Sequence, residues 1–585
     1  MYPRPMLPDM GPMRHLRRAS HSLLLWGCVA VLAALLVYPI LLTVRGGFYA
    51  DPGKREGWTA QHLLMIFQDP RTLHGLLNSL KIALLTTTAA ITVALPLAIL
   101  GARYKFPGKS FFSAMVLVPL ILPPFVGAIG MRALLGREGA LNALLGSHMD
   151  ILANAKLLGV VFVQAFSLYP IIYLNATAAL ANLDPALEES AQNLGAGFWK
   201  RLFRITLPLV RPGVFAGATI VFIWSFTELG TPLMFEYPEV TSVQVFNGLK
   251  EVENSSKPYA LTCVMLATAV GLYLLGKFFF GRKGYAMYSK AARAGSEEVL
   301  SGGKGVLAAA AFTVVCCLAL LPHIGVVLTS ITVPGQWYQT VLPTHLTGRH
   351  YREALTAADS FQAITNSLML AASAMGVDIV LGILIAYLLV RTRAAGRQVL
   401  DALCMLPLAV PGLVMAFGYV AMSLRWPFGK DNPLEHFAGV LTSDPNPVPF
   451  LIAAYSVRRL PYIVRSTVAG LEQTSGELEE AAVNLGASRF TAVRRVILPL
   501  IVANLIAGGL LVFSFSMLEV SDSLILAQRQ EDFPITKAIL AFGDRLGDGP
   551  YVASALGVWG MALLTVTIFA ASSLLGKKLG SIFRV

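Results

Sequence analysis

Long apolar stretches separated by short polar ones dominate the pattern of this chain. A helix needs about 20 mostly apolar residues to cross roughly 30 Å of hydrocarbon. About twelve segments meet that requirement. We expect membrane helices at 21–44, 77–101, 112–135, 157–180, 207–232, 259–281, 305–332, 366–390, 399–424, 450–470, 502–527 and 552–577. The pattern therefore predicts an all-α polytopic membrane protein.

The composition supports lipid as the solvent of this chain. Hydrophobic residues make up 55% of the sequence and charged residues 14%, with a mean hydropathy of +0.65. A soluble fold with these values would expose large apolar patches. The net charge of +13 comes from short basic clusters between apolar runs, as the positive-inside rule expects. We therefore expect a lipid bilayer around the protein and no nucleic-acid partner.

The basic clusters also predict the orientation. The run 23–44 follows Arg14, Arg17 and Arg18, and we interpret it as an uncleaved first helix that starts in the cytoplasm. Six further clusters are expected on the same side: Arg103, Lys105 and Lys109; Lys200, Arg201 and Arg204; Arg282, Lys283, Lys290 and Arg293; Arg391, Arg393 and Arg397; Arg489, Arg494 and Arg495; Lys577, Lys578 and Arg584. Both termini are predicted to be cytoplasmic.

A polar, Gly- and Ser-containing segment divides the chain. We expect a first transmembrane unit at 1–281, a cytoplasmic linker at 282–304 and a second transmembrane unit at 305–585. No GxxxxGK[ST] motif occurs, and SGGKG at 301–305 lacks the length of a phosphate-binding loop. The five cysteines have no zinc-type spacing, so we expect no cofactor and no metal in this chain.

The two units share features at a shift of about 290 residues. Asn78-Ser79 corresponds to Asn366-Ser367, and Glu228 corresponds to Glu519. The prolines correspond as well: Pro119, Pro123 and Pro170 match Pro407, Pro411 and Pro461. The longest match joins EESAQNLGAGFWKRLFRITLPL, from Glu188, to EEAAVNLGASRFTAVRRVILPL, from Glu479. Six helices per unit return the chain to the same side, so the duplication is predicted to be parallel.

These two matched stretches resemble the EAA loop of the permease subunits of type I ABC importers. The first has Glu189, Ser190, Ala191, Gly195 and Pro208, with Ser190 in place of the usual Ala. The second has Glu480, Ala481, Ala482, Gly486 and Pro499, at identical spacings. The resemblance implies the fold of a type I importer permease, with two fused six-helix units.

The same resemblance implies the partners and the location of the chain. Each EAA loop is a coupling helix seated in an ATPase in this family, so two loops imply two copies of a cytoplasmic ABC ATPase subunit. An extracytoplasmic substrate-binding protein is the other expected partner. The chain is then a transport subunit and not an enzyme, in the bacterial cytoplasmic (inner) membrane.

The residue types of the two stretches also fit a docking element when the family resemblance is left aside. Small residues at Ala191 and Ala482 allow close approach, and Gly195 and Gly486 lie where a helix can end in the left-handed conformation. Pro208 and Pro499 can open the following membrane helix. The alternative is an amphipathic helix that rests on lipid headgroups.

Candidate pathway residues lie in otherwise apolar helices. Glu228 and Glu519 are acids at equivalent positions, and Asp522 and Asp378 are further intramembrane acids. Such carboxylates face a cavity or a partner, because exposure to lipid is costly. The alternative is an acid at a helix end or in an inter-helix hydrogen bond.

The second unit alone has Arg458 and Arg459, in place of Ser167 and Leu168. They are expected either to contact an anionic substrate or to pair with Asp522 or Glu519. The four matched prolines of the third and ninth helices are predicted to kink pore helices near the midplane.

The substrate is predicted only at the level of a subfamily. The fused arrangement and the phrase SFTELGTPLMF resemble ferric-iron import permeases. The same class includes permeases for thiamine, phosphonate, sugar phosphate and polyamine, which remain alternatives. An ion-coupled secondary transporter is the alternative from another class, although it needs no ATPase socket.

Overall fold

The computed structural model describes residues 11–575 except 52, 54–55, 121–122, 150–151, 153–154, 281–297 and 443. The predicted linker 282–304 thus lies mostly outside the described residues, and so do Lys577, Lys578 and Arg584. The described chain is almost entirely helical, with two small two-stranded sheets. Strands β1 (Tyr49–Asp51) and β2 (Glu56–Trp58) pair antiparallel, and β3 (Tyr104–Lys105) and β4 (Glu298–Val299) pair parallel.

Nine helical stretches of the described chain are long and apolar enough to span a membrane. They contain α1 (Gly11–Leu32) with η1 (Ala33–Val37) and α2 (Tyr38–Gly47), α4 (Pro70–Arg103), α9 (Lys156–Ala181), α11 (Phe198–Arg201) with η3 (Leu202–Thr206) and α12 (Leu207–Thr227), α15 (Lys257–Phe280), α16 (Gly303–Ser330), α18 (Ala358–Arg391), α23 (Arg489–Ala492) with η6 (Val493–Ile497) and α24 (Leu498–Met517), and α27 (Gly549–Leu575). The other elements are α3 (Gln61–Gln68), α5 (Lys109–Met115), η2 (Val118–Leu120), α6 (Pro124–Leu135), α7 (Ala140–Leu145), α10 (Pro185–Asn193), α13 (Gly230–Met234), α14 (Thr241–Asn247), η4 (Gly248–Glu251), α17 (Arg349–Thr356), α19 (Arg397–Met405), η5 (Leu406–Leu408), α20 (Gly412–Ser423), α21 (Val448–Gln473), α22 (Gly476–Asn484), α25 (Ser521–Leu526), η7 (Gln530–Asp532) and α26 (Ile535–Gly543).

The predicted spans 112–135 and 399–424 are broken rather than kinked. The chain turns by 96° between Lys109–Leu120 and Pro124–Leu145, and by 105° between Arg397–Leu408 and Gly412–Ser423. Each break lies at the matched prolines, which remove a backbone donor and clash with the preceding turn. The predicted span 450–470 is one continuous helix, α21, although its three arginines keep it out of the apolar set.

Two more predicted spans end early. The expected segment 207–232 ends as a helix at Thr227, and 502–527 ends at Met517. In both cases the chain turns and forms a short helix, α13 or α25. We call residues 228–247 the first turn segment and residues 518–543 the second turn segment.

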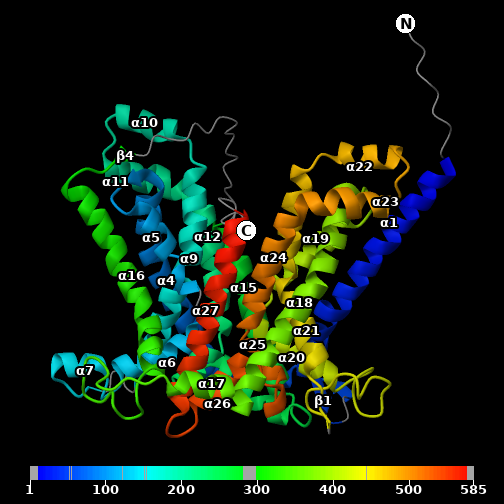
Figure 1. The fold of residues 1–585 in the computed structure, drawn as a ribbon. Helices are drawn as coiled ribbons and strands as arrows, with labels where there is room; N and C mark the ends of the chain where they lie inside the picture. Colours follow the sequence, from blue (N-terminus) through cyan, green and yellow to red (C-terminus); the bar gives the residue numbers. More distant parts are fainter. Residues whose placement is uncertain are drawn as a thin grey trace.

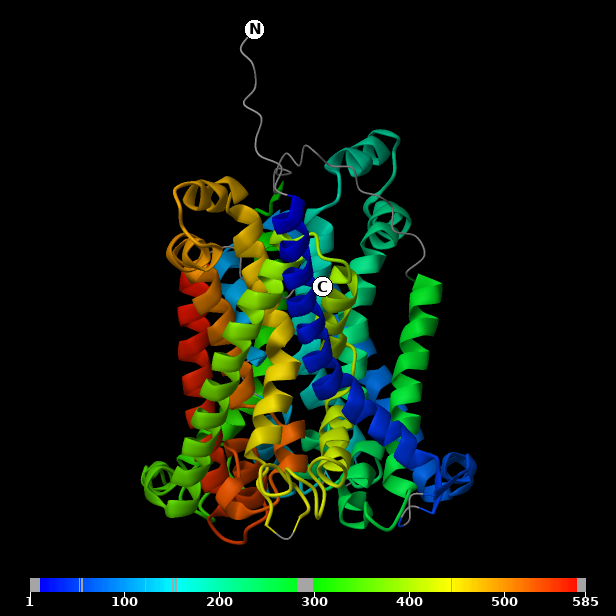
Figure 2. The ribbon, with the colours of Figure 1, turned by 90° about the vertical axis from the view of Figure 1, so that its right-hand side faces the viewer.

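The first helix of each half packs on the other half. Leu25, Cys28 and Leu32 of α1 share a buried cluster with Ile385 and Leu400, and α16 shares one with the helices of the first half. Figure 1 shows α1 beside α18 and α19, and α16 beside α4 and α5. Figure 2 shows α1 crossing the face of the second half. The two halves are therefore intertwined through their first helices.

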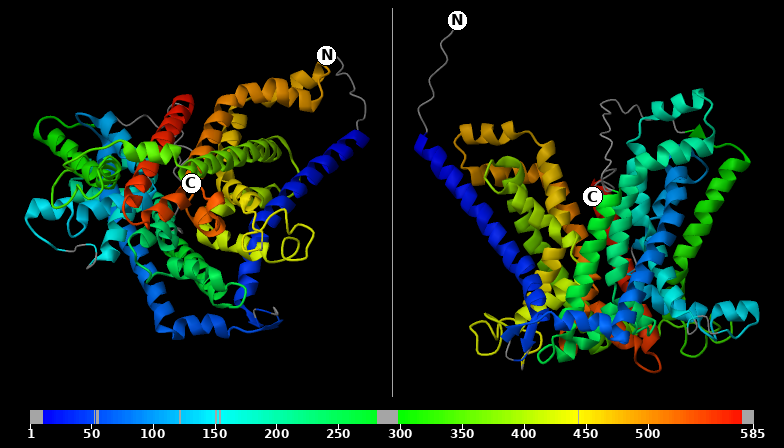
Figure 3. Two further views of the ribbon diagram at one scale, coloured as in Figure 1. Left: turned by 60° about the horizontal axis from the view of Figure 1, so that its bottom comes forward. Right: turned by 180° about the vertical axis from the view of Figure 1, so that it is seen from behind.

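Both matched loops lie on the same side of the molecule, as a parallel duplication requires. Helices α10 and α11 stand at one upper corner of Figure 1, and α22 and α23 at the other. The two groups of helices diverge toward this side and converge toward the opposite side, which the view from behind in Figure 3 repeats.

Candidate functional site

The two short helices of the matched loops end in the same way. Gly195 has a φ of +80° and Gly486 a φ of +90°, so the expected left-handed conformation is present at both. After α10, the Ala196 N–H donates to the Ala191 carbonyl (2.9 Å) and the Gly195 N–H to the Gln192 carbonyl (2.9 Å). The corresponding pair of bonds follows α22. This pattern is a Schellman motif, which ends a helix at a left-handed glycine.

The starts of the two helices are also capped. The Asp184 carboxylate accepts from the Ala186 N–H (3.0 Å) ahead of α10, and the Ser475 hydroxyl accepts from the Glu477 N–H (3.2 Å) ahead of α22. Such caps satisfy backbone donors that a helix start leaves unpaired. Each loop is thus a short helix closed at both ends, and we call α10 and α22 the coupling helices.

The predicted loop residues present an open surface. Glu189 and Glu480 are exposed, as are Ser190 and Ala481. Ala191 and Ala482 are half-buried. A Cβ atom placed on Gly195 or Gly486 meets nothing within 4 Å, so the glycines serve the backbone conformation and not close packing within the chain.

Sequence reasoning missed the residues that anchor the coupling helices. Glu188 contacts Arg103 of α4 and accepts from the Thr206 hydroxyl (2.5 Å), while Glu479 accepts from the Tyr387 hydroxyl of α18 (2.7 Å). Glu188 and Glu479 match between the two halves, and this identity was the available signal. They connect each coupling helix to the second long helix of its own half.

Sequence reasoning also missed an apolar tip on each coupling helix. Leu194 and Leu485, each just before the left-handed glycine, are both 89% exposed. Because the two leucines match between the halves, both coupling helices present the same exposed apolar side chain at their end.

Pro208 and Pro499 stand in the first turn of α12 and α24, as expected, although each of these helices continues an earlier helical stretch. The helix already begins at Phe198 or Arg489, and each proline follows a π-helical segment, η3 or η6. Proline has no N–H for the carbonyl four residues earlier, so the helix widens by one residue there. The Leu207 N–H accordingly donates to the Leu202 carbonyl, and the Leu498 N–H to the Val493 carbonyl.

We expected Glu228 and Glu519 inside helices. Instead, each lies at the start of a turn segment. Glu228 follows the last residue of α12, and Glu519 lies between α24 and α25. They are 8% and 4% exposed. Each lies about 30 residues beyond the start of its long helix, a rise of roughly 45 Å, so both lie far from the coupling helices.

The first turn segment holds its acid with neutral partners. The Glu228 carboxylate accepts from the Thr231 N–H (2.9 Å) and from the Gln164 amide (3.3 Å). The Gln164 carbonyl in turn accepts from the hydroxyls of Ser225 and Thr86. In the described chain, no Lys, Arg or His forms an ion pair with Glu228.

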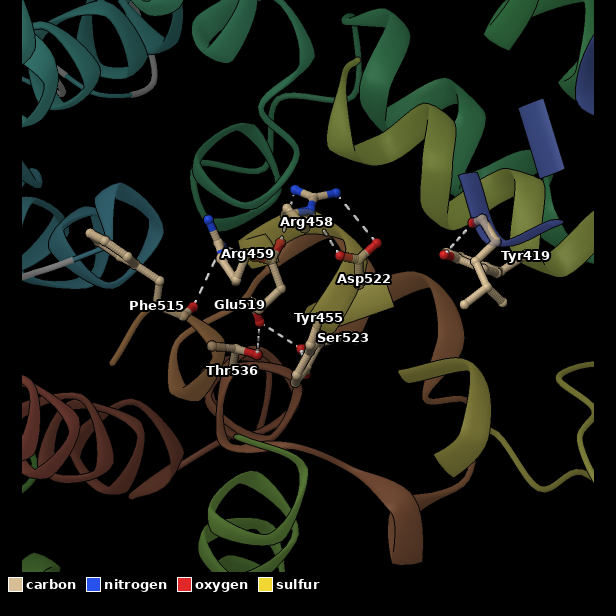
Figure 4. A network of polar contacts seen from close by, with 10 residues as sticks. Tyr419, Tyr455, Arg458, Arg459, Phe515, Glu519, Asp522, Ser523 and Thr536 are labelled. Atoms are coloured by element: carbon tan, nitrogen blue, oxygen red, sulfur yellow. Dashed lines mark hydrogen bonds and ion pairs between the residues drawn. The ribbon is translucent and has the colours of Figure 1, made fainter. Parts of the chain in front are cut away.

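The second turn segment holds its acids with two arginines of α21. Arg458 lies 3.1 Å from the Glu519 carboxylate and 3.1 Å from the Asp522 carboxylate. Arg459 pairs with Glu519 from the other side, as Figure 4 shows. Asp522 is fully buried, and a side chain at Gly412 would collide with the Arg458 guanidinium. The two arginines therefore pair with the acids, and two positive charges face two negative ones.

The backbones of the two turn segments are held by matching bonds. The Ser79 hydroxyl accepts from the Thr241 N–H (2.9 Å), and the Ser367 hydroxyl accepts from the Ile535 N–H (2.8 Å). The side-chain amide of the preceding Asn donates to the carbonyl of Glu239 or Phe533. The Asn-Ser pair that recurs in the sequence is therefore a clamp on each turn segment.

The two turn segments also contact each other. A Cβ atom on Gly230 would lie 3.1 Å from Val520, and one on Gly543 would lie 3.0 Å from Met234. The Lys537 ammonium lies 5.2 Å from the centre of the Phe246 ring and donates to the Leu524 carbonyl (3.0 Å). Burial lowers the pKa of Lys537, on the short helix α26, to about 8. The halves therefore meet here, on the side opposite the coupling helices.

Within the described residues, no group of three or more His, Cys, Asp and Glu side chains is arranged to hold a metal ion. Charged groups deep in the molecule gather at the second turn segment instead.

The chain is similar in sequence to permease proteins of known transport systems. The chain is 26% identical over 539 residues to a ferric transport system permease protein of Actinobacillus pleuropneumoniae, covering 89% of this chain and 73% of the relative. It is 25% identical over 487 residues to an Fe(3+)-transport system permease protein of Haemophilus influenzae, covering 83% and 86%. A molybdenum transport system permease protein of Escherichia coli is 33% identical over 171 residues, which cover 29% of this chain and 74% of the relative.

A protein-family model matches the chain twice, at residues 90–245 and 378–578, which together make up more than half of it. The family is described as the binding-protein-dependent transport system inner membrane component. Each match contains one coupling helix and one of the two matched acids, Glu228 or Glu519. This chain is a multi-pass membrane protein, and it belongs to the family of inner membrane components of binding-protein-dependent transport systems.

Proposed function

We propose that this chain is the complete transmembrane pore of an ATP-driven importer for ferric iron, with both halves of the pore in one polypeptide. The observation that supports this most strongly is the pair of equally built coupling helices on one side of the molecule. Two relatives that cover more than four fifths of the chain are named for ferric or Fe(3+) transport.

The two coupling helices fit two copies of a cytoplasmic ATPase subunit. Each offers an exposed leucine, an exposed glutamate and a rigid glycine-terminated end. Leu194 and Leu485 would fill apolar pockets on the two ATPases, because burying a leucine side chain contributes about 1.5–3 kcal/mol. Glu188 and Glu479 would carry a displacement of the coupling helices into α4 and α18.

The orientation follows from this assignment. The coupling helices would lie in the cytoplasm, and α1 begins on the same side. The turn segments would then lie toward the extracytoplasmic side, where a binding protein delivers the substrate. Contact between the turn segments would then correspond to a pore that is closed on the extracytoplasmic side.

The proposal is tested by reconstitution with the two expected partners. The purified chain, mixed with a candidate ABC ATPase subunit and a candidate binding protein from the same organism, should form an assembly with two ATPase copies, measured by native mass spectrometry. Proteoliposomes in which the ATPase faces the lumen should accumulate ferric iron in the lumen only when ATP is enclosed there. One ATPase copy per chain, or uptake without ATP, would contradict the proposal.

Coupling is tested separately with glycine and leucine variants. Gly195→Val and Gly486→Val place a β-branched residue at a left-handed position, and Leu194→Ser and Leu485→Ser remove the apolar tips. We expect the leucine pair to weaken ATPase binding by at least tenfold. Leu187→Ser, which alters an exposed leucine at the start of α10, is the matched control. Unchanged ATPase binding in the leucine double variant would refute the docking role.

Substrate identity needs its own measurement, because a molybdenum permease is also related to part of the chain. Uptake of ferric iron should proceed in the presence of excess molybdate. Uptake of molybdate in place of iron would assign the chain to an anion importer.

A further inference from the structure

The described end of the linker joins the first half next to its coupling helix. Strand β4 pairs in parallel with β3, which follows directly after Arg103, the last residue of α4. The Leu300 N–H then donates to the Lys105 carbonyl (2.9 Å). Arg103 is also the residue that contacts Glu188 of the coupling helix α10. Figure 1 shows β4 at the same upper corner as α10 and α11. The linker therefore ends beside the first coupling helix.

This link depends on the backbone and on one side chain. Glu298 and Val299 of β4 are exposed, Val299 by 70%. Leu300 packs against the buried cluster that contains Ala98 and Phe106 of the first half. Adding a strand in this way gives binding strength through main-chain hydrogen bonds. Loss of the Leu300 N–H should therefore weaken the link.

The link continues directly into the first helix of the second half. A Cβ atom on Gly305 of α16 would lie 2.6 Å from the Leu300 carbonyl oxygen and 3.3 Å from Pro107. Phe312 of α16 is fully buried, and its ring centre lies 5.2 Å from that of Phe106. Strand β4 and the first turns of α16 thus form one packed unit with the end of α4.

The other end of α16 lies near the first turn segment. The helix has 28 residues, which corresponds to roughly 42 Å. A Cβ atom on Gly130 of α6 would lie 2.5 Å from the Pro322 carbonyl oxygen, so the backbones of α6 and α16 touch. One on Gly230 of the first turn segment would lie 2.7 Å from Phe125 of α6. A single continuous helix therefore joins the surroundings of the first coupling helix to the support of the first turn segment.

The second coupling helix has no equivalent link in the described chain. Arg391, which corresponds to Arg103, donates to the carbonyls of Leu471 (3.0 Å) and Thr474 (2.6 Å), just before α22. Residues 392–396 pair with no strand in the part of the chain that the structure describes. The link is therefore no requirement of the shared fold.

Energetic coupling between distant sites is carried by packed side chains, hydrogen bonds and rigid elements. We propose that β4 and α16 pass the displacement of the first coupling helix on to the second half, so that the linker belongs to the coupling machinery. A displacement of α10 would move the end of α4 through Glu188 and Arg103, and the paired strands would move the start of α16 with it. This role rests on the proposed function, because it needs an ATPase bound at α10.

The test first breaks the strand pair. Leu300→Pro keeps an apolar side chain and removes the N–H that binds the Lys105 carbonyl. In proteoliposomes with the ATPase and the binding protein, the full-length variant should transport at least fivefold less ferric iron per ATP hydrolysed. ATP hydrolysis and the assembly with two ATPase copies should persist, because α10 is unchanged. Ser301→Pro is the matched control, since the Ser301 N–H donates no hydrogen bond in the described chain, and it should transport like the unmodified protein.

A disulfide then restores the pair. Lys105 and Val299 are partners in the register, and neighbouring strands lie about 4.8 Å apart, which a disulfide can bridge. Lys105→Cys/Val299→Cys should therefore form the bond on oxidation. In the Leu300→Pro background, oxidation should return the iron transported per ATP to the parent value, and reduction should lower it again. Without Leu300→Pro, the oxidised form should keep full uptake, because the pair stays closed during transport.

Three results would overturn the proposal: unchanged iron transport per ATP in Leu300→Pro, no disulfide in the double-cysteine variant, or loss of uptake once that disulfide has formed. If Leu300→Pro does not fold, a Gly-Ser-Gly insertion after Leu300 replaces it, and full iron transport per ATP in that variant overturns the proposal equally. The proposed function itself fails on a different result, namely no ATP-driven uptake by the unmodified chain.

Discussion

The two turn segments are held by matching hydrogen bonds but differ in their electrostatics. In the first, the Glu228 carboxylate is held by a backbone N–H and the Gln164 amide. In the second, the Glu519 carboxylate lies between Arg458 and Arg459, and Arg458 also contacts Asp522. The clamp from Asn and Ser is the same in both.

This difference shows what the duplicated halves share and what each has acquired. The Asn and Ser side chains that position the turn segments bind backbone N–H and C=O groups. If these side chains were replaced by apolar ones, the backbone groups would be left unpaired inside the protein. The charges around the acids are not fixed by the backbone, so they differ between the halves. Of the two matched acids, only Glu228 is therefore free of any ion pair with a basic residue of the described chain.

The largest expected effect is on the ion pairs of the second turn segment. Arg458→Ala would leave Asp522 buried without its arginine, and breaking a buried ion pair in this way costs about 3–5 kcal/mol. Ser167→Ala at the matching position of the first half should change stability by less than about 1 kcal/mol. Equilibrium unfolding in mixed detergent micelles measures both. Equal losses in the two variants would mean that the two segments do not differ in this way.

The sequence predicts the duplication, the coupling loops and most of the spans. The sequence repeat provides this information. For example, Gly195 and Gly486 occupy equivalent positions in the two halves, and both adopt the left-handed conformation. It does not predict the ends of α12 and α24, where apolar residues continue past Glu228 and Glu519 and hide the turns. Hydropathy measures the transfer of side chains to lipid and is blind to a turn that neighbouring helices cover.

The crossed first helices also escape the pattern. Leu25 and Leu32 are apolar whichever half they contact, so their hydropathy cannot assign a partner. For the arginines, the sequence favours pairing with the acids over substrate contact, and the distances to Glu519 and Asp522 confirm the pairing. A role of Glu228 and Glu519 in the pathway remains a prediction, since both are buried in this closed arrangement.

The second effect concerns the neutral network of the first turn segment. Gln164→Leu would leave the Ser225 hydroxyl without its acceptor and the Glu228 carboxylate with one donor fewer, which should cost about 1–3 kcal/mol. Ala165→Leu at the next position of α9 is a packing control, because it alters a buried neighbour and no polar contact. The same unfolding measurement applies. A stability equal to that of the unmodified chain would show that the Gln164 bonds do not hold Glu228.

The third effect is on transport. Glu228→Gln keeps the shape and removes the acid that no arginine neutralises, so ferric-iron uptake should fall about tenfold, equivalent to about 1.4 kcal/mol in the barrier. Stability should change little, because Gln can accept from the same Thr231 N–H. Uptake in proteoliposomes is compared with Glu239→Gln, an acid of the same turn segment whose carbonyl, not its carboxylate, is used by the clamp. Full uptake by the Glu228→Gln variant would show that the Glu228 carboxylate has no role in the transport pathway.

The smallest effect tests the shared scaffold itself. The Ser242 hydroxyl donates to the Glu228 carbonyl (2.8 Å), and the Thr536 hydroxyl donates to the Glu519 carbonyl (2.7 Å). Ser242→Ala should cost about 1 kcal/mol, the usual net value of such a bond. Thr536→Val should cost less, because the Glu519 carbonyl keeps a second donor in the Ser523 hydroxyl (2.5 Å). Unfolding of the two variants and of the Thr536→Val/Ser523→Ala pair measures this, and the pair should reach at least the cost of Ser242→Ala. If Thr536→Val alone is the more costly of the two, then the second turn segment depends on its scaffold more than the first, despite its arginines.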